Sequence, residues 1–366
     1  MRLQPPEQDD LTVDERFCEY GISYNRYGLY RNAFDHRLRR VTALDMSGLD
    51  TDLLDRFLSR WSQDTRKIDA TVPLLRTYIR YWPVRRGKPF VWSRVVEPYF
   101  AWRPRAFRAR TAFGFDLEGN SKDLIQQWVY YLGVWEPALT AWIRRRLQRG
   151  DTFIDVGANV GYYALLASQS VGPSGRIVAI EASPAICASL RRNAALNRAD
   201  NVRIVNVAAF GCRSTVRLYR GNDANCGETT IVNEFGGDLE CEVDAFPLHE
   251  LLTPAELESA RLIKIDAEGA EYTILAGLDS FRRLRPDVEL IVEVHPDYLA
   301  KRGESLDELL ALMHREAFIP YVVQEEYWVP AYLERKPVFE PPRRLSAPVK
   351  DGTALVFSRI DADVLP

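Results

Sequence analysis

Apolar residues in the second half of the chain follow two alternating spacings, which indicate strands and helices in turn. Short, nearly continuous apolar runs such as Phe153-Ile-Asp-Val156 have the length of buried strands. Stretches with apolar residues every three or four positions follow them, as in amphipathic helices. The pattern predicts, in chain order, strand 152–156, helix 162–170, strand 176–181, helix 184–193, strand 202–207, strand 261–266, helix 270–281, strand 288–294, helix 305–315 and closing strands 319–323 and 353–358.

Strands that alternate with helices predict an α/β fold with a mostly parallel sheet and helices on both faces. Between residues 215 and 243 the apolar period changes to two, which predicts an inserted antiparallel hairpin. Ligands of parallel sheets bind beyond the carboxyl ends of the strands. Candidate functional residues are therefore expected at those ends.

The first part of the chain has a different character. Residues 1–85 are rich in charge and aromatic rings, with apolar spacing that predicts a helix at 50–62, so we interpret them as a partly helical accessory region. Residues 86–135 are basic, aromatic and interrupted by prolines, which favours β and turn structure leading into the core. The regular α/β domain is expected at 136–366, where Pro137 begins a helix that Gly150 caps.

Basic and aromatic residues are interleaved between Arg76 and Arg110, where the single acid is Glu97. Such a stretch either recognises an anionic substrate or carrier, or covers the accessory region with its aliphatic stems while the charges stay in water. The second interpretation is favoured by the sequence alone.

Composition limits the partners of this chain. A formal net charge of −3 argues against nucleic-acid binding through global charge. The five cysteines are scattered without a C-x-x-C pair, which fits a reducing cytosol better than a disulfide framework or a zinc site. The amino-terminal residues lack the apolar core of a secretory signal, and no apolar run approaches the roughly 20 residues that span a bilayer. We expect a soluble cytoplasmic protein without a nucleic-acid or membrane partner, and a homodimer remains open.

The first predicted strand runs into the glycine turn Gly157-Ala-Asn-Val-Gly161. Gly157 permits a tight turn, and Gly161 lets the next helix begin close to the strand and to a ligand. The spacing G-x-x-x-G differs from the G-x-G-x-x-G of dinucleotide binders, which disfavours a nicotinamide-dependent oxidoreductase. S-adenosylmethionine fits better because it carries a carboxylate but no pyrophosphate.

Two carboxylates complete a nucleoside site in this interpretation. Asp155, at the end of the first strand, suits the positively charged amino-acid end of such a ligand. Glu181, at the end of the second strand and 20 residues after Gly161, can accept two hydrogen bonds from a ribose diol.

Ionisable residues also mark the ends of two later strands. Lys264 and Asp266 alternate with large aliphatic residues and so point to the same side, and Glu293 and His295 alternate in the same way. Buried ionisable groups need partners or a ligand. Together with Glu268, they are expected to converge.

These motifs, taken together, resemble a known family. Asp155-Val-Gly-Ala-Asn-Val-Gly-Tyr-Tyr163, Glu181-Ala-Ser-Pro184, Leu262-Ile-Lys-Ile-Asp-Ala-Glu-Gly-Ala-Glu271 and Ile291-Val-Glu-Val-His295 are similar, in order, to motifs of the FkbM-type methyltransferases. The similarity covers roughly residues 136–318. It implies a class I Rossmann-like fold with a mostly parallel seven-stranded sheet. It also implies S-adenosylmethionine as donor and methylation of a hydroxyl on a sugar, polyketide or other secondary metabolite.

The resemblance assigns donor contacts by motif. The amino-acid part would lie by the glycine turn, the ribose on Glu181, and the adenine near residues 206–209, where the family's acidic residue is missing. Ala182 stands where the family often has proline, which concerns loop rigidity. The residues implied for donor binding are Asp155, Gly157, Ala158, Asn159, Gly161, Glu181, Ala182 and Ala208.

Methyl transfer is an in-line displacement, and an alcohol attacks readily only if a base removes its proton. His295 is the natural base because its ordinary pKa is near 6.5; Asp266 or Glu268 would orient the imidazole or act instead. The predicted catalytic residues are His295, Asp266, Glu268, Lys264 and Glu293.

Other interpretations remain open at this point. Lys264 and Asp266 can form a structural ion pair, and three of the carboxylates (Asp266, Glu268, Glu293) can ligate Mg²⁺, although no spacing demands a metal. The chain can also methylate an amine, which needs less base catalysis, or act as a non-catalytic binding scaffold with this fold.

Overall fold

The structure is a computed structural model that describes residues 56–59, 61, 65–101, 104–220, 229–231, 238–278, 281–325, 327–334, 339–349 and 352–366. The chain divides into two compact units, residues 1–60 and 61–366, and the second contains all the elements discussed below. The helix predicted at 50–62 and most of the predicted accessory region's first 60 residues lie outside the described ranges.

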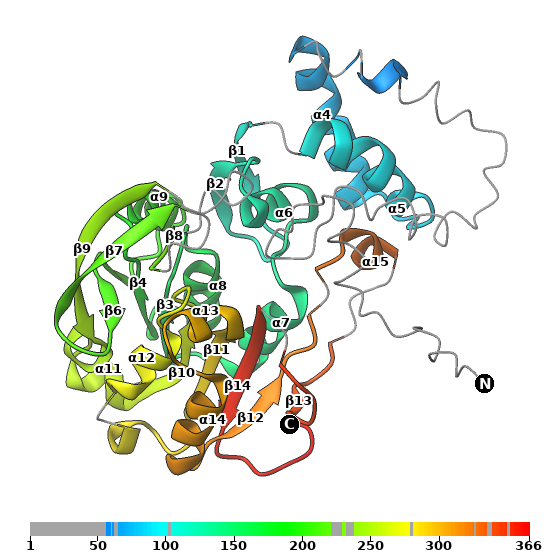
Figure 1. Cartoon of the computed structure of the whole chain (residues 1–366). Coiled ribbons are helices and arrows are strands. Elements are labelled where there is room, and N and C mark those ends of the chain that lie inside the picture. The colour runs from blue at the N-terminus through cyan, green and yellow to red at the C-terminus, as the bar shows by residue number, and fades with distance from the viewer. Residues whose placement is uncertain are drawn as a thin grey trace, which may run out of the picture. The chain divides into compact units, whose positions relative to one another are not determined.

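A central sheet carries the fold of the second unit (Figure 1). Its strand order is β13-β12-β14-β11-β10-β3-β4-β5. The five strands from β5 to β11 run parallel, and β14 lies antiparallel between β11 and β12. The bounds are β3 (Thr152–Val156), β4 (Arg176–Ile180), β5 (Val202–Val205), β10 (Ala260–Ile265), β11 (Glu289–Val294), β12 (Ile319–Val322), β13 (Arg343–Arg344) and β14 (Thr353–Ser358).

The predicted mostly parallel α/β sheet is thus confirmed, with one correction to the strand count. The seven expected strands are joined by the two-residue strand β13, which pairs with the edge strand β12. From β3 the chain proceeds outward to β4 and β5 on one side, and β10 and β11 fill the other side. The strand order therefore reverses between β3 and β10, where open α/β sheets bind ligands.

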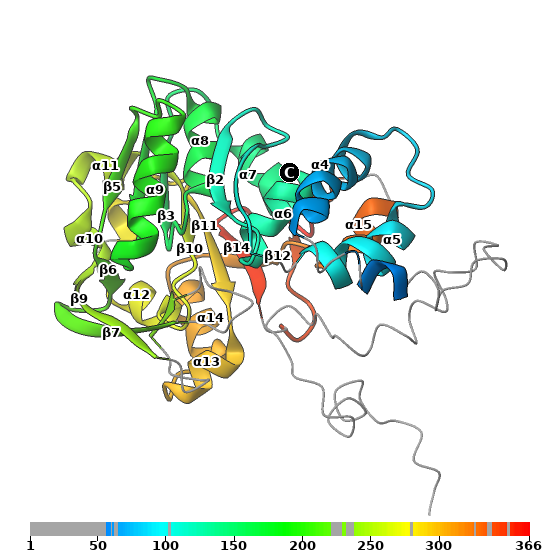
Figure 2. The same cartoon turned by 90° about the horizontal axis from the view of Figure 1, so that it is seen from above.

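Helices cover both faces of this sheet (Figure 2). Helices α7, α8 and α9 lie on one face, and α12 and α14 lie on the other. On the second face Ile274, Leu309 and Met313 pack into one apolar cluster with strand residues such as Ile154 and Ile263. The helix bounds are α7 (Pro137–Arg146), α8 (Tyr162–Val171), α9 (Pro184–Leu196), α10 (Leu248–Leu251), α11 (Pro254–Ser259), α12 (Glu271–Ala276), η2 (Phe281–Arg283), α13 (Pro296–Lys301), α14 (Leu306–Arg315) and α15 (Val329–Glu334).

Two helix ends differ from the prediction. Helix α12 ends at Ala276, five residues early, because Gly277 packs directly on the backbone of Gly211. Helix α7 ends at Arg146 because the backbone of Leu147 becomes extended and its side chain is buried. Gly150 therefore does not cap α7. It makes a later turn, in which its N–H donates to the carbonyl of Val171.

The predicted hairpin at residues 215–243 is confirmed and belongs to a separate four-stranded sheet. Strands β7 (Ser214–Arg220) and β9 (Leu239–Pro247) pair antiparallel, β6 (Ala208–Phe210) runs parallel to β9, and β8 (Thr229–Thr230) adds to β7. This small sheet follows the end of β5 and so lies next to the carboxyl ends of the parallel strands.

Residues 86–135 are more helical than predicted. The elements from residue 65 onward are α4 (Thr65–Tyr81), α5 (Lys88–Val91), the π-helix η1 (Trp92–Ala101), β1 (Ala106–Arg110), β2 (Asp116–Asn120) and α6 (Leu124–Leu132). Pro98 lies inside η1, whose wider turn departs from the α-helical hydrogen-bond pattern. Burial of Trp92, Val96 and Phe100 along one side of η1 outweighs the local penalty of the proline.

Two asparagines attach the β1–β2 hairpin to the sheet domain. The side-chain amide of Asn197, at the end of α9, accepts from the N–H of Asp116 and donates to its carbonyl. Asn193 forms the same pair of bonds with Glu118. Side chains of α9 therefore bind the backbone N–H and C=O groups of β2 and hold the hairpin against the core.

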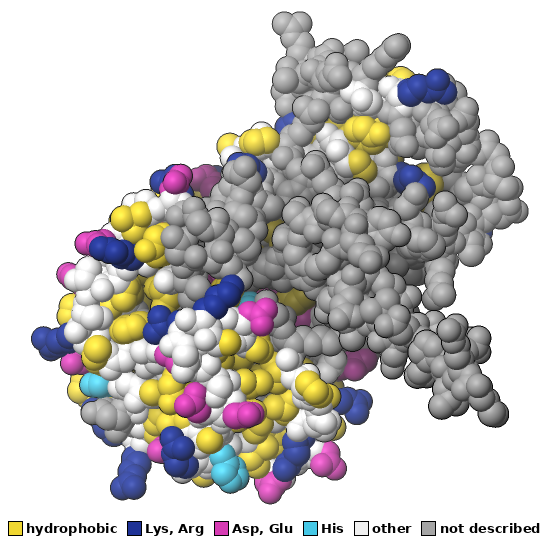
Figure 3. Space-filling view, viewed as in Figure 1, with side chains coloured by type: hydrophobic (Ala, Val, Ile, Leu, Met, Phe, Trp, Pro, Cys, Tyr) yellow, Lys and Arg dark blue, Asp and Glu magenta, His cyan; other side chains and the backbone are white. Residues whose placement is uncertain are grey.

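Acidic and basic side chains are interspersed on the face of the molecule shown in Figure 3. Among the described residues, no helix is both long enough and apolar enough to cross a membrane.

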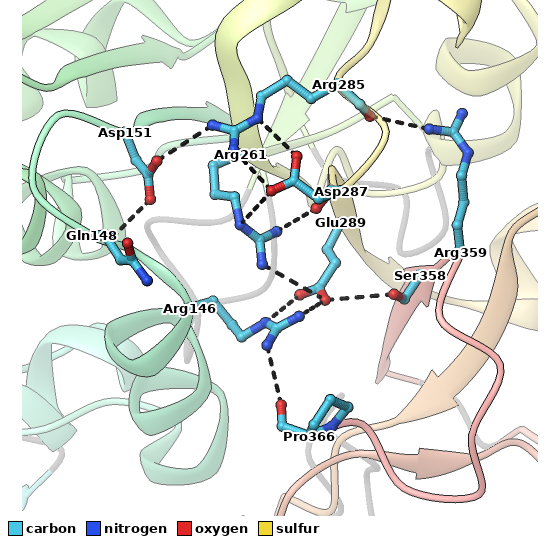
Figure 4. A network of polar contacts seen from close by, with 10 residues as sticks. All are labelled: Arg146, Gln148, Asp151, Arg261, Arg285, Asp287, Glu289, Ser358, Arg359 and Pro366. Carbon is cyan, nitrogen blue, oxygen red and sulfur yellow. Dashed lines mark hydrogen bonds and ion pairs between the residues drawn. The ribbon is translucent and has the colours of Figure 1, made fainter.

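A buried network joins the amino ends of the strands, opposite the predicted ligand edge (Figure 4). Glu289, at the start of β11, is 1% exposed and accepts two hydrogen bonds from the guanidinium of Arg146 on α7. Arg261 of β10 lies 3.9 Å from the same carboxylate, and the hydroxyl of Ser358 on β14 lies 3.5 Å away. The carboxylate thus ties one helix to three strands.

Removal of this carboxylate should destabilise the fold. We expect Glu289→Ala to lower the free energy of unfolding by about 3 kcal/mol or more, because it leaves Arg146 largely buried without its carboxylate partner, while Arg261 keeps only its contacts with Asp287. Urea denaturation measures the loss. Glu242→Ala is the matched control: its pair with Arg217 is exposed and should contribute less than about 1 kcal/mol. Equal losses in the two variants would contradict a structural role for the network.

Candidate functional site

The carboxyl ends of β3, β4, β10 and β11 bring the predicted residues to one edge of the sheet. In the register of the sheet, Asp155 is paired with Lys264, which is paired in turn with Ile291. Asp266, Glu293 and the residues after them therefore extend beyond the same edge. This is the edge at which the strand order reverses.

The glycine turn after β3 is held by its neighbours. The N–H groups of Gly157 and Ala158 both donate to the carbonyl of Ile180 in β4. Gly157 has φ +77°, and a Cβ there would lie 1.8 Å from the carbonyl oxygen of Asp266. The turns after β3 and β10 thus touch through backbone atoms, and only glycine fits at this contact.

Glu181 ties the glycine turn to the loop after β4. Its carboxylate accepts from the N–H of Asn159 at 2.8 Å and from the N–H of Ser183 at 2.9 Å. Burial raises the pKa of Glu181 to about 7, although both backbone hydrogen bonds act in the opposite direction. Each oxygen accepts one of these hydrogen bonds and so keeps capacity for a second, as a ribose diol would require.

Asp155 differs from Glu181 and Glu271 because its carboxylate is not held by hydrogen bonds from neighbouring loops. It is 1% exposed, and neither carboxylate oxygen has a hydrogen-bond partner among the described residues. Burial raises its pKa to about 6, with Asp266 acting in the same direction and Lys264 and the backbone of Ala164 acting in the opposite direction. A buried carboxylate without partners is costly, so this position fits a ligand that brings a cationic or hydrogen-bonding group.

An apolar surface lies beside these carboxylates. Ala182 packs with Ala208 in the cluster beneath the four-stranded sheet, where the adenine is predicted. The inserted β9 adds an acid that the sequence did not single out: Glu240 accepts a 2.6 Å hydrogen bond from the hydroxyl of Ser183. The spacing of Glu240 in the hairpin indicates only an exposed strand position, so the sequence held no signal for this contact.

Lys264 is the central cation of the site. Its ammonium is 3% exposed, lies 2.9 Å from Asp266 and stacks over the ring of Tyr163. Burial alone would lower its pKa, but the pKa is raised above its ordinary value by four acids: Asp266, Asp155, Glu293 and Glu136. Lys264 therefore remains charged, and the predicted ion pair with Asp266 is present.

Glu136 is a site residue that the sequence interpretation missed. Its backbone is left-handed, with φ +39°, and its buried carboxylate accepts hydrogen bonds from the hydroxyls of Tyr163 and Tyr327. Burial, assisted by Glu293, raises its pKa to about 7. In the sequence, Glu136 is marked only as the residue before the helix-starting Pro137, and Tyr327 lies in a segment without any motif.

His295 and Glu293 lie side by side at the end of β11. The imidazole is fully buried, its Nε2 is 3.4 Å from a carboxylate oxygen of Glu293, and its ring lies against Tyr298. The carboxylate placed next to the imidazole is thus Glu293, whereas Asp266 pairs with Lys264. Glu293 is the better candidate for orienting the ring.

The turn after β10 is fixed by Glu271. Its carboxylate accepts from the N–H groups of Ala267 and Gly269, which gives this acid a structural role. Burial raises its pKa, with His295 acting in the opposite direction. Glu268 has a left-handed φ of +51°, and its carbonyl accepts from the hydroxyl of Thr230 on β8.

The cluster can hold a cationic ligand group and accept a proton. Within the described ranges, no group of three or more His, Cys, Asp or Glu side chains is arranged to hold a metal ion. The carboxylates of the proposed magnesium set have other neighbours, since Asp266 contacts Lys264 and Glu293 contacts His295.

The contact between the two turns can be tested by adding one methyl group. Gly157→Ala should lower the free energy of unfolding by about 2–5 kcal/mol, because left-handed strain is added to a clash with backbone. Gly303→Ala is the control, since Gly303 has φ +73° with open space around it and should lose only about 1–2 kcal/mol. Chemical denaturation of both variants checks this difference; equal losses would mean that the turns do not touch.

Known proteins share parts of this sequence. Methyltransferase sdnD of Sordaria araneosa is 28% identical over 155 residues, which cover 34% of this chain and 60% of that protein. An arsenite methyltransferase of Halobacterium salinarum is 38% identical over 53 residues, which cover 14% of each chain. The chain thus spans less than two thirds of the length of either curated relative.

Among solved structures, the methyltransferase FkbM of Methylobacillus flagellatus KT is similar with a TM-score of 0.33 and 15% identity, over 64% of this chain and 55% of that one. Residues 155–320, which begin at the unpaired Asp155 and extend to the start of β12, match the family model described as "Methyltransferase FkbM domain". Residues 155–320 of this chain are therefore similar to the methyltransferase domain of the FkbM family, and they lie in an α/β fold with a mostly parallel sheet.

Proposed function

We propose that this protein transfers the methyl group of S-adenosylmethionine to a hydroxyl oxygen of a sugar, polyketide or other secondary metabolite. The observation that carries the proposal is the buried, unpaired carboxylate of Asp155 beside the glycine turn. It supplies the charge that the donor's ammonium group needs, next to a cluster that can accept a proton.

The donor, when bound, supplies a methyl carbon activated by a positively charged sulfur. Asp155 accepts hydrogen bonds from the donor's ammonium group, and Glu181 accepts those of the ribose hydroxyls through its remaining lone pairs. Ala182 and Ala208 offer an apolar surface for the adenine. These roles use atoms that the protein itself leaves free or partly free.

The acceptor hydroxyl is activated by His295. Glu293, with a carboxylate oxygen 3.4 Å from Nε2, holds one orientation of the ring and stabilises the imidazolium that forms. Lys264 is not a base, because the surrounding carboxylates keep it protonated. Its task is to neutralise those carboxylates so that they stay together at the site.

Donor binding should depend on pH through Asp155. Its raised pKa means that the ligand-free protein holds a proton there below about pH 6, and the ligand's ammonium requires its release. The affinity for S-adenosylhomocysteine should therefore rise with pH, by up to about tenfold per unit, and level off once Asp155 and Glu181 are ionised, near pH 7.

Calorimetry with S-adenosylhomocysteine in buffers of different ionisation enthalpy measures both the affinity and the protons released. Asp155→Asn should bind more weakly and lose the part of the pH dependence centred near pH 6. Well-folded wild-type protein that fails to bind this ligand would overturn the enzyme proposal and favour a non-catalytic scaffold.

Catalysis and donor binding should separate in two variants. His295→Ala should lower turnover by about 10²–10⁴-fold with donor affinity unchanged, whereas Glu181→Ala should weaken donor affinity because it loses the ribose acceptor and loosens the glycine turn. His314→Ala, an exposed position on α14, is the control. Steady-state kinetics on an acceptor found by screening alcohols and amines checks this. Unchanged turnover in His295→Ala would rule out His295 as base and favour an amine acceptor.

A further inference from the structure

A cavity of about 140 Å³ lies apart from the strand ends, among helices α4, α5, α6 and α15. Helices α5 and α15 lie side by side in both views, although their sequences are far apart (Figures 1 and 2). Three cationic side chains, Arg80, Arg85 and Lys88, line the cavity with the phenol of Tyr332 and apolar residues. None of its lining residues is acidic.

Lys88 is the most deeply buried of these cations. It is 6% exposed, and its ammonium donates one hydrogen bond, of 2.7 Å, to the carbonyl of Ile79. Burial lowers its pKa, and the neighbouring charge of Arg85 lowers it further. No carboxylate among the described residues lies within ion-pair distance of Lys88, so two of its three N–H donors are available for another acceptor.

Arg80 has an unused donor as well. One end of its guanidinium donates to the carbonyl of Arg110, but Nη1 is buried and has no acceptor within the described part of the chain. The group lies over Gly133, where an added Cβ would be 2.6 Å from its central carbon. Burial lowers the pKa of Arg80. Packing therefore holds the guanidinium in place, and its Nη1 has no hydrogen-bond acceptor among the described residues.

Arg85 and Tyr332 are the other polar residues that line the cavity. Arg85 reaches the carbonyl of Leu333 on α15 at 3.4 Å. The pKa of Tyr332 is raised, first by burial and then by Glu325, with Arg85 acting in the opposite direction, so its phenol stays protonated and can donate. Three like charges around one cavity repel each other unless an anion lies between them.

We propose that this cavity binds a small oxyanion of the phosphate or phosphate-monoester class. A dianion matches three cations better than a carboxylate does, and guanidinium forks suit its oxygens. The volume accommodates several waters or one tetrahedral oxyanion. The basic stretch Arg76–Arg110 then has an anion-binding function, which the sequence interpretation had considered but not favoured.

The cavity wall is connected to the methyltransferase site by aromatic rings. Tyr332 lies 6.1 Å from Trp128, Trp128 lies 5.5 Å from Trp135, and Trp135 lies 5.8 Å from Tyr327, measured between ring centroids. Tyr327 donates to Glu136 in the site. The bound oxyanion can thus be either a phosphate group of the acceptor or a separate anion, and both sources have the same recognition chemistry.

The test is titration of the full chain with inorganic phosphate and with phenyl phosphate, followed by calorimetry and thermal denaturation at ionic strength matched with sodium chloride. We expect saturable binding and a rise in Tm. Arg80→Gln and Lys88→Met should weaken phosphate affinity at least tenfold, and the milder Tyr332→Phe should weaken it less. Arg86→Gln, an exposed neighbour outside the cavity, should bind like the wild type.

Absence of saturable phosphate binding by the wild-type protein at millimolar concentration would overturn the proposal, as would equal loss of affinity in Arg86→Gln. Tighter binding of phenyl phosphate than of inorganic phosphate would support a monoester acceptor, and the reverse order would support a separate anion. Affinity for S-adenosylhomocysteine, measured on the same samples, should be unchanged in all four variants. A failure of the phosphate proposal can therefore be distinguished from a failure of the proposed methyltransferase function.

Discussion

The ammonium of Lys264 is the charge around which the carboxyl ends of the strands are organised. Acids from three strands and from the start of α7 surround it, and together they raise its pKa despite its burial. Without this cation, several largely buried carboxylates would repel each other. Lys264 pairs with Asp266 at the start of the turn after β10, and that turn touches the glycine turn after β3.

The buried charged side chains of this protein differ in how many hydrogen bonds and ion pairs they form with the rest of the chain. At the amino ends of the strands, Glu289 is surrounded by donors and its network connects four elements. At the carboxyl ends, Asp155 is as deeply buried but has no hydrogen-bond partner among the described residues. The cavity between α5 and α15 shows the converse case, because Lys88 has no carboxylate within ion-pair distance in the part of the chain that the structure describes.

Inserted and flanking elements contribute to the site as much as the sheet does. The small sheet brings Glu240 to the loop after β4 and Thr230 to the turn after β10. The segment before α15 brings Tyr327 to Glu136. In this way, parts of the chain that carry no shared motif contact both the loop after β4 and the turn after β10.

The sequence by itself determined the order of strands and helices in the sheet domain, the bounds of β3 and β14, and the glycine turn at 157–161, because each rests on local periodicity or on glycine conformation. It misjudged the ends of α7 and α12 and the helices of residues 86–135, where burial of residues distant in sequence outweighs local signals. Only the tertiary structure decided that Glu136 and Tyr327 belong to the site, that Glu293 accompanies His295, and that three cations share one cavity. Those contacts join segments up to about 250 residues apart, and pairings at such distances leave no periodic trace in the chain.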